Sequence, residues 1–311
     1  MNGSNTKDIY LRIGTRSSRL AISQVDEFIL SFERHFPNSH IKVIPIKTEG
    51  DIKKDVPLSQ MIRGMFVREI EEALMSNRID IAIHSAKDLP PDTIPSLKIA
   101  AMLKRVDPRD VIINKWKLPL SEIPDSAIIG TSSPRREAFI RSTRNELTVK
   151  PIRGNVETRL SKIGNGYDGV ILAAAGLLRL GLSHVINEYL DTNVLIPDVG
   201  QGALAIQTRS SDKTTQDLVS VINDSPTFLS VTAERAFMRT LGGSCNMPAA
   251  AYAQIKNQTI TIAGMACSYD GQTVYKDEIE GDLQFAEKIG CELATKLIGK
   301  GASKIIEEKR Q

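Results

Sequence analysis

The segment at residues 127–160, AIIGTSSPRREAFIRSTRNELTVKPIRGNVETRL, decides the fold class because strand-like and helix-like patterns alternate along it. Short β-branched and apolar runs predict strands, and each run is followed by apolar residues at helical spacing. The expected strand and helix pairs are 127–130 with 134–144, 147–152 with 156–163, and 169–174 with 177–180. Strands that alternate with helices are typical of a mostly parallel α/β sheet.

The chain on the N-terminal side of this segment shows the same alternation, whereas the last part of the chain does not. Strands are expected at 9–14, 40–47, 79–84 and 97–103, and helices at 19–36 and 65–76. A break near 105–108 separates the two units, and Pro197 with two glycines marks a return crossing at 196–202. Residues 226–297 predict a helix, three strands with a hairpin at Asp270-Gly271, and a second helix, which indicates a small α+β domain.

Composition excludes several classes of protein. The chain has 311 residues, of which 41% are hydrophobic and 25% charged, so it can bury a core and is not expected to be disordered. Its longest run of apolar residues and glycine, 169–178, is far shorter than the roughly 20 residues of a membrane-spanning helix. The polar start of the chain shows no signal peptide pattern, and three cysteines are too few for a disulfide framework. We therefore expect a cytoplasmic protein without a membrane partner.

The distribution of charge is more informative than the net charge of 40 − 37 = +3. Residues 131–180 contain nine Lys and Arg against four Asp and Glu, which gives 9 − 4 = +5 for this segment. Most of these cations are arginines, whose planar guanidinium pairs bidentately with carboxylate or phosphate. A nucleic-acid partner is disfavoured, because the whole chain is nearly neutral and only 5% aromatic.

Arginines follow several of the expected strands at the turn into the next helix. In 130–136, GTSSPRR, Ser133 is expected as N-cap and Pro134 as the first helical residue, followed by Arg135 and Arg136. Two arginines there oppose the helix dipole by roughly 0.3–1 kcal/mol each, and a bound anion would offset this cost. The alternative is that both guanidinium groups are simply solvated.

Three further turns repeat the arrangement. They place Arg16 with Ser18, Arg153 with Asn155 as N-cap, and Arg179 after the strands at 9–14, 147–152 and 169–174. In open parallel sheets such turns share the carboxyl edge, where ligands bind. The sequence therefore predicts one anion site lined by arginines from several turns.

Lys87 and Asp88 follow an apolar strand in the segment 81–90, IAIHSAKDLP. A carboxylate among cations at such an edge should stay ionised, and it could stabilise a developing positive charge or relay protons. The alternative is a local ion pair in a loop.

Other familiar patterns are discarded. The G-x-G-x-x-G matches at 164–169 and 200–205 precede strands instead of opening helices, so neither predicts a dinucleotide site. The four histidines show no ligand spacing, so no protein-bound metal is expected. Cys267 and Cys291 fall in an expected strand and helix and are predicted to be inert core thiols. Cys245 lies in a glycine-rich loop without a histidine motif, which favours a covalent attachment point over a papain-like nucleophile.

Nine segments, taken in chain order, resemble the porphobilinogen deaminase family. They are RSSRLA at 16–21, TEGD at 48–51, GMF at 64–66 with Glu69, HSAKD at 84–88, GTSSPRR at 130–136, RGN at 153–155 with Arg159, AAGLLRLG at 174–181, VGQG at 199–202, and GSCNMP at 243–248. The resemblance spans essentially the whole chain, and the region after Pro248 is its least diagnostic part.

The resemblance implies a fold and an activity. It implies an α/β fold with two periplasmic-binding-protein-like lobes of mixed, mostly parallel sheets, joined by two crossings, and a small α+β C-terminal domain. The expected domains are 1–104 with 202–222, 105–201, and 223–311. A monomer would carry a dipyrromethane cofactor through a thioether to Cys245. Four porphobilinogen units would be joined to that primer with loss of ammonia, and hydrolysis would release linear hydroxymethylbilane.

The resemblance also assigns residues. Catalysis is expected of Asp88 and Lys87, and the cofactor is expected to contact Cys245, Lys87, Asp88, Thr131, Ser132, Ser133, Arg135, Arg136, Arg153, Gly154, Asn155, Arg159 and Gln201. Incoming substrate is expected to contact Arg16, Ser18, Phe66 and Arg179. Each pyrrole bears two carboxylates, so the full oligomer brings about a dozen into one cleft, where two unit charges about 4 Å apart interact by roughly 4 kcal/mol. Asp88 would stabilise the azafulvenium-type cation that deamination leaves.

Two departures from the family pattern are visible, and one alternative function stays open. Residues 61–64 read Met-Ile-Arg-Gly where many relatives have Gly-Gly-Lys-Gly, which predicts a stiffer lid, and Ser244 replaces a glycine before Cys245. A non-enzymatic carboxylate-binding protein could share the two-lobed architecture. Such a protein would need neither Asp88 among its cations nor the thiol of Cys245.

Overall fold

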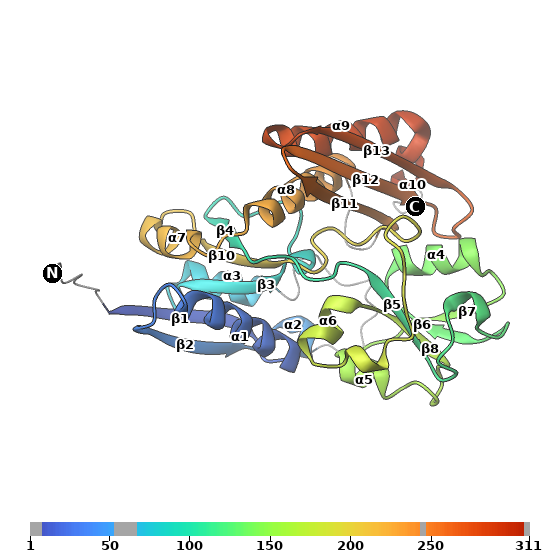
Figure 1. Ribbon diagram of the computed structural model, residues 1–311, viewed down its shortest axis with the longest axis horizontal. Helices are drawn as coiled ribbons and strands as arrows, with labels where there is room; N and C mark the ends of the chain where they lie inside the picture. The colour runs from blue at the N-terminus through green and yellow to red at the C-terminus, as the bar shows by residue number, and fades with distance from the viewer. Residues whose placement is uncertain (1–7, 53–66, 243–246, 308–311) are drawn as a thin grey trace.

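The computed structural model describes residues 8–52, 67–242 and 247–307, and within them the chain forms three sheets with flanking helices (Figure 1). The first sheet has the strand order β2-β1-β3-β10-β4. Its strands are β2 (Ser39–Ile46), β1 (Ile9–Arg16), β3 (Ile81–Ser85), β10 (Leu204–Arg209) and β4 (Leu97–Met102). β1 is parallel to β2 and β3, and β10 is antiparallel to both of its neighbours.

Helices α1 (Arg19–Glu33), α3 (Arg68–Met75) and α7 (Lys213–Ser220) cover the faces of the first sheet. The short helix α2 (Glu49–Ile52) follows β2. Phe28 and Phe32 of α1 pack with Ile81 on one face, whereas Ile70 of α3 packs with Ala82 on the other. Successive strand residues point to opposite faces, and the first four residues of β3, three of them apolar, are buried, so the strand is covered on both sides.

The second sheet repeats this plan with the order β7-β6-β8-β5-β9. Its elements are β7 (Thr148–Lys150), β6 (Ile128–Gly130), β8 (Gly169–Ala173), β5 (Asp110–Asn114), β9 (Glu188–Tyr189), α4 (Pro134–Thr143), α5 (Val156–Leu160) and α6 (Ala174–Arg179). β6 is parallel to β7 and β8, and β5 is antiparallel to β8. α4 packs on one face, while α5 and α6 pack on the other.

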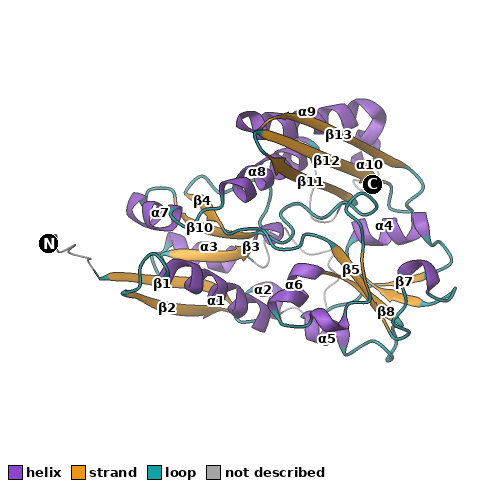
Figure 2. Cartoon of the chain, in the orientation of Figure 1, coloured by secondary structure: helices purple, strands orange, loops and turns teal. Residues whose placement is uncertain are grey.

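The third sheet is antiparallel in the order β11-β12-β13 (Figure 2). Its elements are α8 (Ser225–Thr240), β11 (Ala249–Lys256), β12 (Thr259–Cys267), β13 (Val274–Asp282), α9 (Ala286–Leu297) and α10 (Ser303–Glu307). α8 and α9 cover one face, and the other face carries Met265 and Cys267 against Ala138 of α4. Gly271, whose φ is +74°, occupies the predicted β12–β13 turn.

The chain crosses between the first two sheets twice, as the sequence predicts. It leaves the first sheet after β4, enters the second with β5, and returns to the first as β10. The α/β class, the mixed and mostly parallel sheets, and the small α+β domain are therefore confirmed. The residue limits of the three domains stay a prediction.

Two strands and three helices were not predicted from the sequence, and some boundaries differ. The missed elements are β5, β9, α2, α7 and α10. All five residues of β5 are buried, and β5 directly follows the expected break between the lobes. The sequence pattern predicted that alternating strands and helices begin again only at residue 127. The first helix ends at Glu33 instead of 36, because the residue before Pro37 is disfavoured in helical conformation. Among the described residues, no helix is long and apolar enough to span a membrane.

A buried histidine in β3 predicts how stability depends on pH. His84 Nε2 lies 3.1 Å from Gln207 Oε1, and burial lowers the pKa of His84 from 6.5 to about 4. The unfolded chain therefore takes up the proton first, and stability is lost as the pH falls from about 6.5 to about 4. At pH 5 this loss is about 2 kcal/mol.

Urea unfolding at pH 7.5 and pH 5 tests this prediction. We expect the wild-type free energy of unfolding to fall between these pH values by about 2 kcal/mol more than that of His84→Gln. Groups common to both proteins, including Glu71, which bonds Gln207 and whose pKa burial raises, cancel in the comparison. Equal losses in the two proteins would show that His84 does not take part.

Candidate active site

The turn that carries Lys87 and Asp88 follows β3 directly, as a short 3-10 helix at Ala86–Asp88. The return crossing at residues 196–202 packs against this turn. Gly200 has a φ of +71°, and a Cβ there would lie 2.9 Å from Ala86 Cβ and 3.1 Å from Lys87 N. Only glycine fits, and the next residue, Gln201, accepts a hydrogen bond at 3.2 Å from Lys87 Nζ.

The antiparallel strands β10 and β5 explain why both crossings reach the carboxyl edges of the sheets. β10 begins at Leu204 opposite Ser85, the last residue of β3, and β5 begins at Asp110 opposite Ala173, the last residue of β8. An antiparallel strand starts where its parallel neighbours end. The crossings therefore deliver Gln201 and Asp110 to the carboxyl edges, where the turns with the predicted site residues also lie.

The arginines at the start of α4 are buried and share one carboxylate. Ser133 is the N-cap and Pro134 the first helical residue, as predicted, although the Ser133 side chain makes no capping hydrogen bond. Arg135 Nη1 lies 2.6 Å from Asp110 Oδ2, and Arg136 Nη2 lies 2.6 Å from Asp110 Oδ1. The exposed fraction is 2% for Arg135 and 7% for Arg136, and Asp110 is completely buried.

This arrangement corrects the expected reason for the paired arginines. The compensating anion was expected to come from a ligand, but part of the compensation is internal. Burial raises the pKa of Asp110, but Arg135 and Arg136 outweigh it and hold that pKa far below its usual range. Asp110 is therefore ionised, and the two guanidinium groups keep one net positive charge.

Arg159 lies among cations from both lobes. Burial and the positive charges of Arg136, Arg153 and Arg16 lower the pKa of Arg159 to about 10. The negative charge of Asp88 acts in the opposite direction and raises that pKa. Burial and Arg136 also lower the pKa of Lys87, against the charges of Asp88, Asp198 and Asp110. Charges act in this way only over short distances, so the predicted cations Lys87, Arg16, Arg136, Arg153 and Arg159 lie in one cluster with Asp88.

Two members of this cluster have no direct ion-pair partner among the described residues. Within the described ranges, neither Lys87 nor Arg159 forms an ion pair, and Arg159 Nε instead donates to Gly154 O at 2.8 Å. Uncompensated cations held close together are unfavourable unless an anion joins them. An anion that entered the cluster would relieve this repulsion.

Other predicted residues shape the turns. Thr131 Oγ1 accepts a hydrogen bond from Ser133 N, and Ser132 Oγ donates to Ile152 O at 2.7 Å. Asn155 caps α5 through Thr158 N, as predicted, and Gly154 before it has a φ of +113°. In the same way, Ser18 caps α1 through Ala21 N at 3.2 Å. These side chains hold the loops that present Arg16, Arg153 and Arg159.

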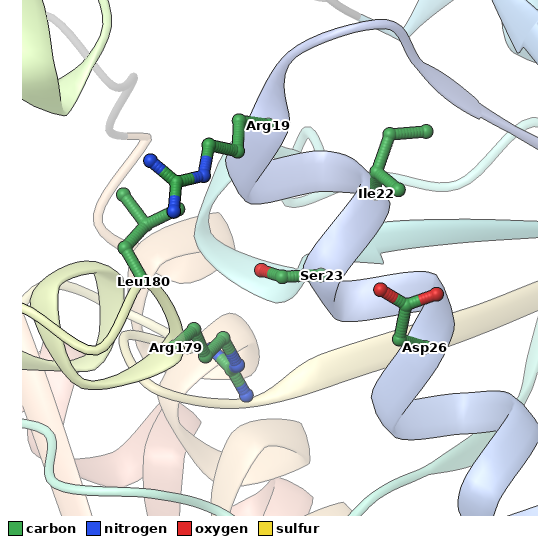
Figure 3. A pocket seen from close by; sticks show the side chains of 6 residues that line it. All are labelled: Arg19, Ile22, Ser23, Asp26, Arg179 and Leu180. Atoms are coloured by element: carbon green, nitrogen blue, oxygen red, sulfur yellow. The ribbon is translucent and has the colours of Figure 1, made fainter.

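Arg179 lies at a contact between the lobes, where α1 and α6 run side by side (Figure 1). Arg179 Nε donates to Glu27 Oε2 of α1 at 2.8 Å, and Arg19 Nη1 pairs with Glu157 at 2.6 Å. A surface hollow of about 360 Å³ between the helices is lined by Arg19, Ile22, Ser23, Asp26, Arg179 and Leu180 (Figure 3). Arg179 therefore has an internal carboxylate partner, which was not predicted from the sequence.

Phe66, the lid segment 61–64 and Cys245 lie outside the described residues, but one flank of the cysteine loop is defined. Pro248 is buried, and its carbonyl accepts a hydrogen bond from Cys267 Sγ at 3.2 Å. Burial raises the pKa of the Cys267 thiol to about 11, against the nearby charge of Arg135. Cys267 is thus the buried thiol that was predicted.

Two carboxylates near the cations, Asp110 and Asp198, were not predicted from the sequence. Asp198 lies on the return crossing, and its charge acts on both Lys87 and Arg135. An aspartate that opens the apolar run 110–113 was the available signal for Asp110. Among the described residues, no cluster of histidine, cysteine and carboxylate side chains could hold a metal ion.

Comparison with known proteins identifies the family. A model described as "Porphobilinogen deaminase, dipyromethane cofactor binding domain" matches residues 11–217, and one described as "Porphobilinogen deaminase, C-terminal domain" matches residues 228–299. This chain belongs to the porphobilinogen deaminase family. The family is one of tetrapyrrole-assembling enzymes, and the first matched domain is the one that binds dipyrromethane.

Relatives in this family match over nearly their full length. The porphobilinogen deaminase of Syntrophus aciditrophicus is 40% identical over 299 residues, which covers 96% of this chain and 98% of the relative. Those of Deinococcus radiodurans and Thermus thermophilus are each 42% identical, with the same coverage. Among solved structures, the methionine binding protein MetQ covers 71% of this chain and 90% of its own at 10% identity and a TM-score of 0.45. The two lobes are the two five-stranded sheets described above.

Proposed function

We propose that this chain joins four porphobilinogen units head to tail on a dipyrromethane primer attached to Cys245 and then releases hydroxymethylbilane. The observation that carries the proposal is the cationic cluster at the carboxyl edges of both sheets. Lys87 and Arg159 have no ion-pair partner among the residues described, and Arg16, Arg136 and Arg153 act on Arg159. A growing chain of acetate- and propionate-bearing rings supplies the anions that such a cluster needs.

The residues present fit the cofactor. Besides the two uncompensated cations, Arg135 Nε is buried and has no hydrogen-bond partner in the described structure, which suits a further anionic group. Lys87, Arg135, Arg136, Arg153, Arg159 and Gln201 would hold the cofactor carboxylates, and the turns at Thr131–Ser133 and Gly154–Asn155 would approach it. The bound cofactor supplies the pyrrole carbon to which the first unit is joined.

The chemistry balances without an oxidant or a metal. In each addition the C–N bond of the aminomethyl group breaks, ammonia leaves, a C–C bond forms, and the pyrrole carbon that is joined loses a proton. Loss of ammonia leaves positive charge on the substrate. Asp88 is exposed at the end of its turn and is the carboxylate whose charge acts on both Lys87 and Arg159. We assign it to stabilise that positive charge, with proton transfer as its second role.

The remaining assignments belong to the same proposal. Arg16, Ser18, Phe66 and Arg179 would meet incoming porphobilinogen, and Arg179 would then exchange Glu27 for a substrate carboxylate. We expect a cytoplasmic monomer whose lobes comprise residues 1–104 with 202–222 and residues 105–201, with a third domain at 223–311.

Intact mass spectrometry of the full-length chain tests the proposal. Limiting porphobilinogen should produce species heavier by one to four pyrrole units, each added with loss of ammonia, and the starting mass should return when product is released. Cys291→Ser, which changes a thiol in α9, should give the same series. A folded protein whose mass never changes while the substrate stays unconsumed would overturn the proposed function.

A further inference from the structure

We propose that Asp110 is the positioning residue of this site: its carboxylate fixes Arg135 and Arg136 directly and Lys87 through Gln201. The inference rests on the proposed function and adds to it a residue that binds neither substrate nor cofactor. Asp110 is the first residue of β5 and is completely buried, so its contacts are all with the protein.

Both oxygens of Asp110 accept hydrogen bonds from charged or amide donors. Oδ2 accepts from Arg135 Nη1 at 2.6 Å. Oδ1 accepts from Arg136 Nη2 at 2.6 Å, from Arg136 Nε at 3.0 Å and from Gln201 Nε2 at 3.0 Å. A charged acceptor that takes several donors holds each of them in a defined direction. Asp110 therefore orients two guanidinium groups and one amide together.

The amide of Gln201 transmits this orientation to Lys87. Gln201 Nε2 donates to Asp110 Oδ1 and, at 2.7 Å, to the carbonyl of Pro108. Neither of these groups can donate, so the amide nitrogen must face them and Oε1 must face the other way. There Oε1 accepts from Lys87 Nζ at 3.2 Å, and an ammonium group can only donate. The chain of contacts thus allows one amide orientation.

This chain of contacts joins the two lobes at the site. Asp110, Arg135 and Arg136 belong to the second sheet and its helix α4, Gln201 lies on the return crossing, and Lys87 follows β3 of the first sheet. Because the carboxylate balances one of the two guanidinium charges, the arginine pair keeps one positive charge. Arg135 Nε has no hydrogen-bond partner among the described atoms. Asp110 thereby sets both the direction and the number of charges that the cluster offers to a carboxylated ligand.

The charge of Asp110 also favours the protonated form of Lys87, in opposition to Arg136. Replacing Asp110 by the isosteric Asn removes this carboxylate and leaves two arginines uncompensated nearby. The loss of the negative charge and the two uncompensated positive charges both disfavour the protonated form of Lys87, so we expect the pKa of Lys87 to fall. Because the ligand-facing groups also lose their orientation, we expect kcat to fall by about 10- to 100-fold, with a smaller change in KM.

The experiment titrates lysines labelled with carbon-13 at the ε position in the full-length chain, with Lys87→Met to identify the resonance of Lys87. Asp107→Asn is the matched control, because the Asp107 carboxylate pairs with Arg109 at 2.6 Å in the same crossing and, within the described structure, has no hydrogen bond or ion pair with Gln201 or α4. Asp110→Asn should lower the pKa of Lys87 and kcat, and Asp107→Asn should change neither. An unchanged Lys87 titration in a folded Asp110→Asn protein would overturn the inference.

A second variant keeps the test decisive if Asp110→Asn does not fold. Gln201→Met keeps both Asp110–arginine pairs but removes the acceptor of Lys87, so the pKa of Lys87 should again fall. No change in that titration would overturn the inference. The lysine titration needs no turnover, so it separates this inference from the proposed function, which fails instead if the wild type gains no pyrrole mass.

Discussion

Asp88→Asn should lower kcat by about 100- to 1,000-fold, the size of loss typical when one group that stabilises charge in a transition state is removed. Asp88 is exposed at the end of the Ala86–Asp88 turn and forms no ion pair within the described structure, so folding does not depend on it. Its carboxylate faces a region dominated by Lys87 and Arg159. Asparagine keeps the size of the side chain but removes the negative charge that opposes developing positive charge.

Steady-state kinetics and urea unfolding check this prediction together. The free energy of unfolding should change by less than about 0.5 kcal/mol, as expected for an exposed substitution. Asp92→Asn, an exposed aspartate on the following loop, is the matched control and should keep wild-type kcat. Near-normal turnover in Asp88→Asn would show that Asp88 has no role in the reaction.

Glu234→Gln destabilises the fold by about 3–5 kcal/mol, the usual cost of breaking a buried ion pair by changing one partner. Glu234 in α8 is completely buried and accepts from Arg105 Nη1 at 2.6 Å, Arg105 Nη2 at 3.0 Å, Gly200 N at 2.7 Å and Ala253 N at 2.9 Å. The carboxylate thus ties together both crossings and the third domain. Glutamine would turn an NH₂ group toward donors that need an acceptor.

Thermal and urea unfolding measure this effect. Glu287→Gln, which alters an exposed pair with Arg239, is the control and should change stability by less than about 1 kcal/mol. Because Gly200 presses on the Lys87 turn, Glu234→Gln should also lower kcat in the fraction that stays folded. A loss below about 1 kcal/mol would show that the crossings are held by other contacts.

Much of the fold and the location of the site could be predicted from local patterns in the sequence. The turn residues Ser133, Pro134 and Asn155 mark helix starts through chemistry that acts within a few residues, so their helices begin where expected. Because strands that share a direction end at one edge, the arginines that follow them could be grouped before any distance was known. In the structure, Arg16, Arg136 and Arg153 lie close enough to Arg159 for their charges to act on it.

The internal carboxylates could not be predicted in this way, because they act over long sequence distances. Asp110 meets Arg135 only after β5 has inserted antiparallel beside β8, and Glu27 meets Arg179 only when α1 packs on α6. A run of five buried residues shows no periodicity of its own, so β5 and its aspartate were missed together. Counting arginines therefore overstated how many positive charges remain for a ligand.

The most direct test of the central claim, that the cationic cluster serves an oligomer tethered to one thiol, is the intact mass of the purified chain beside Cys245→Ser. We predict that the wild type and Cys291→Ser carry an extra mass of two pyrrole units and that Cys245→Ser carries none. A wild-type mass equal to that of the bare polypeptide, or an adduct that survives in Cys245→Ser, would contradict this claim.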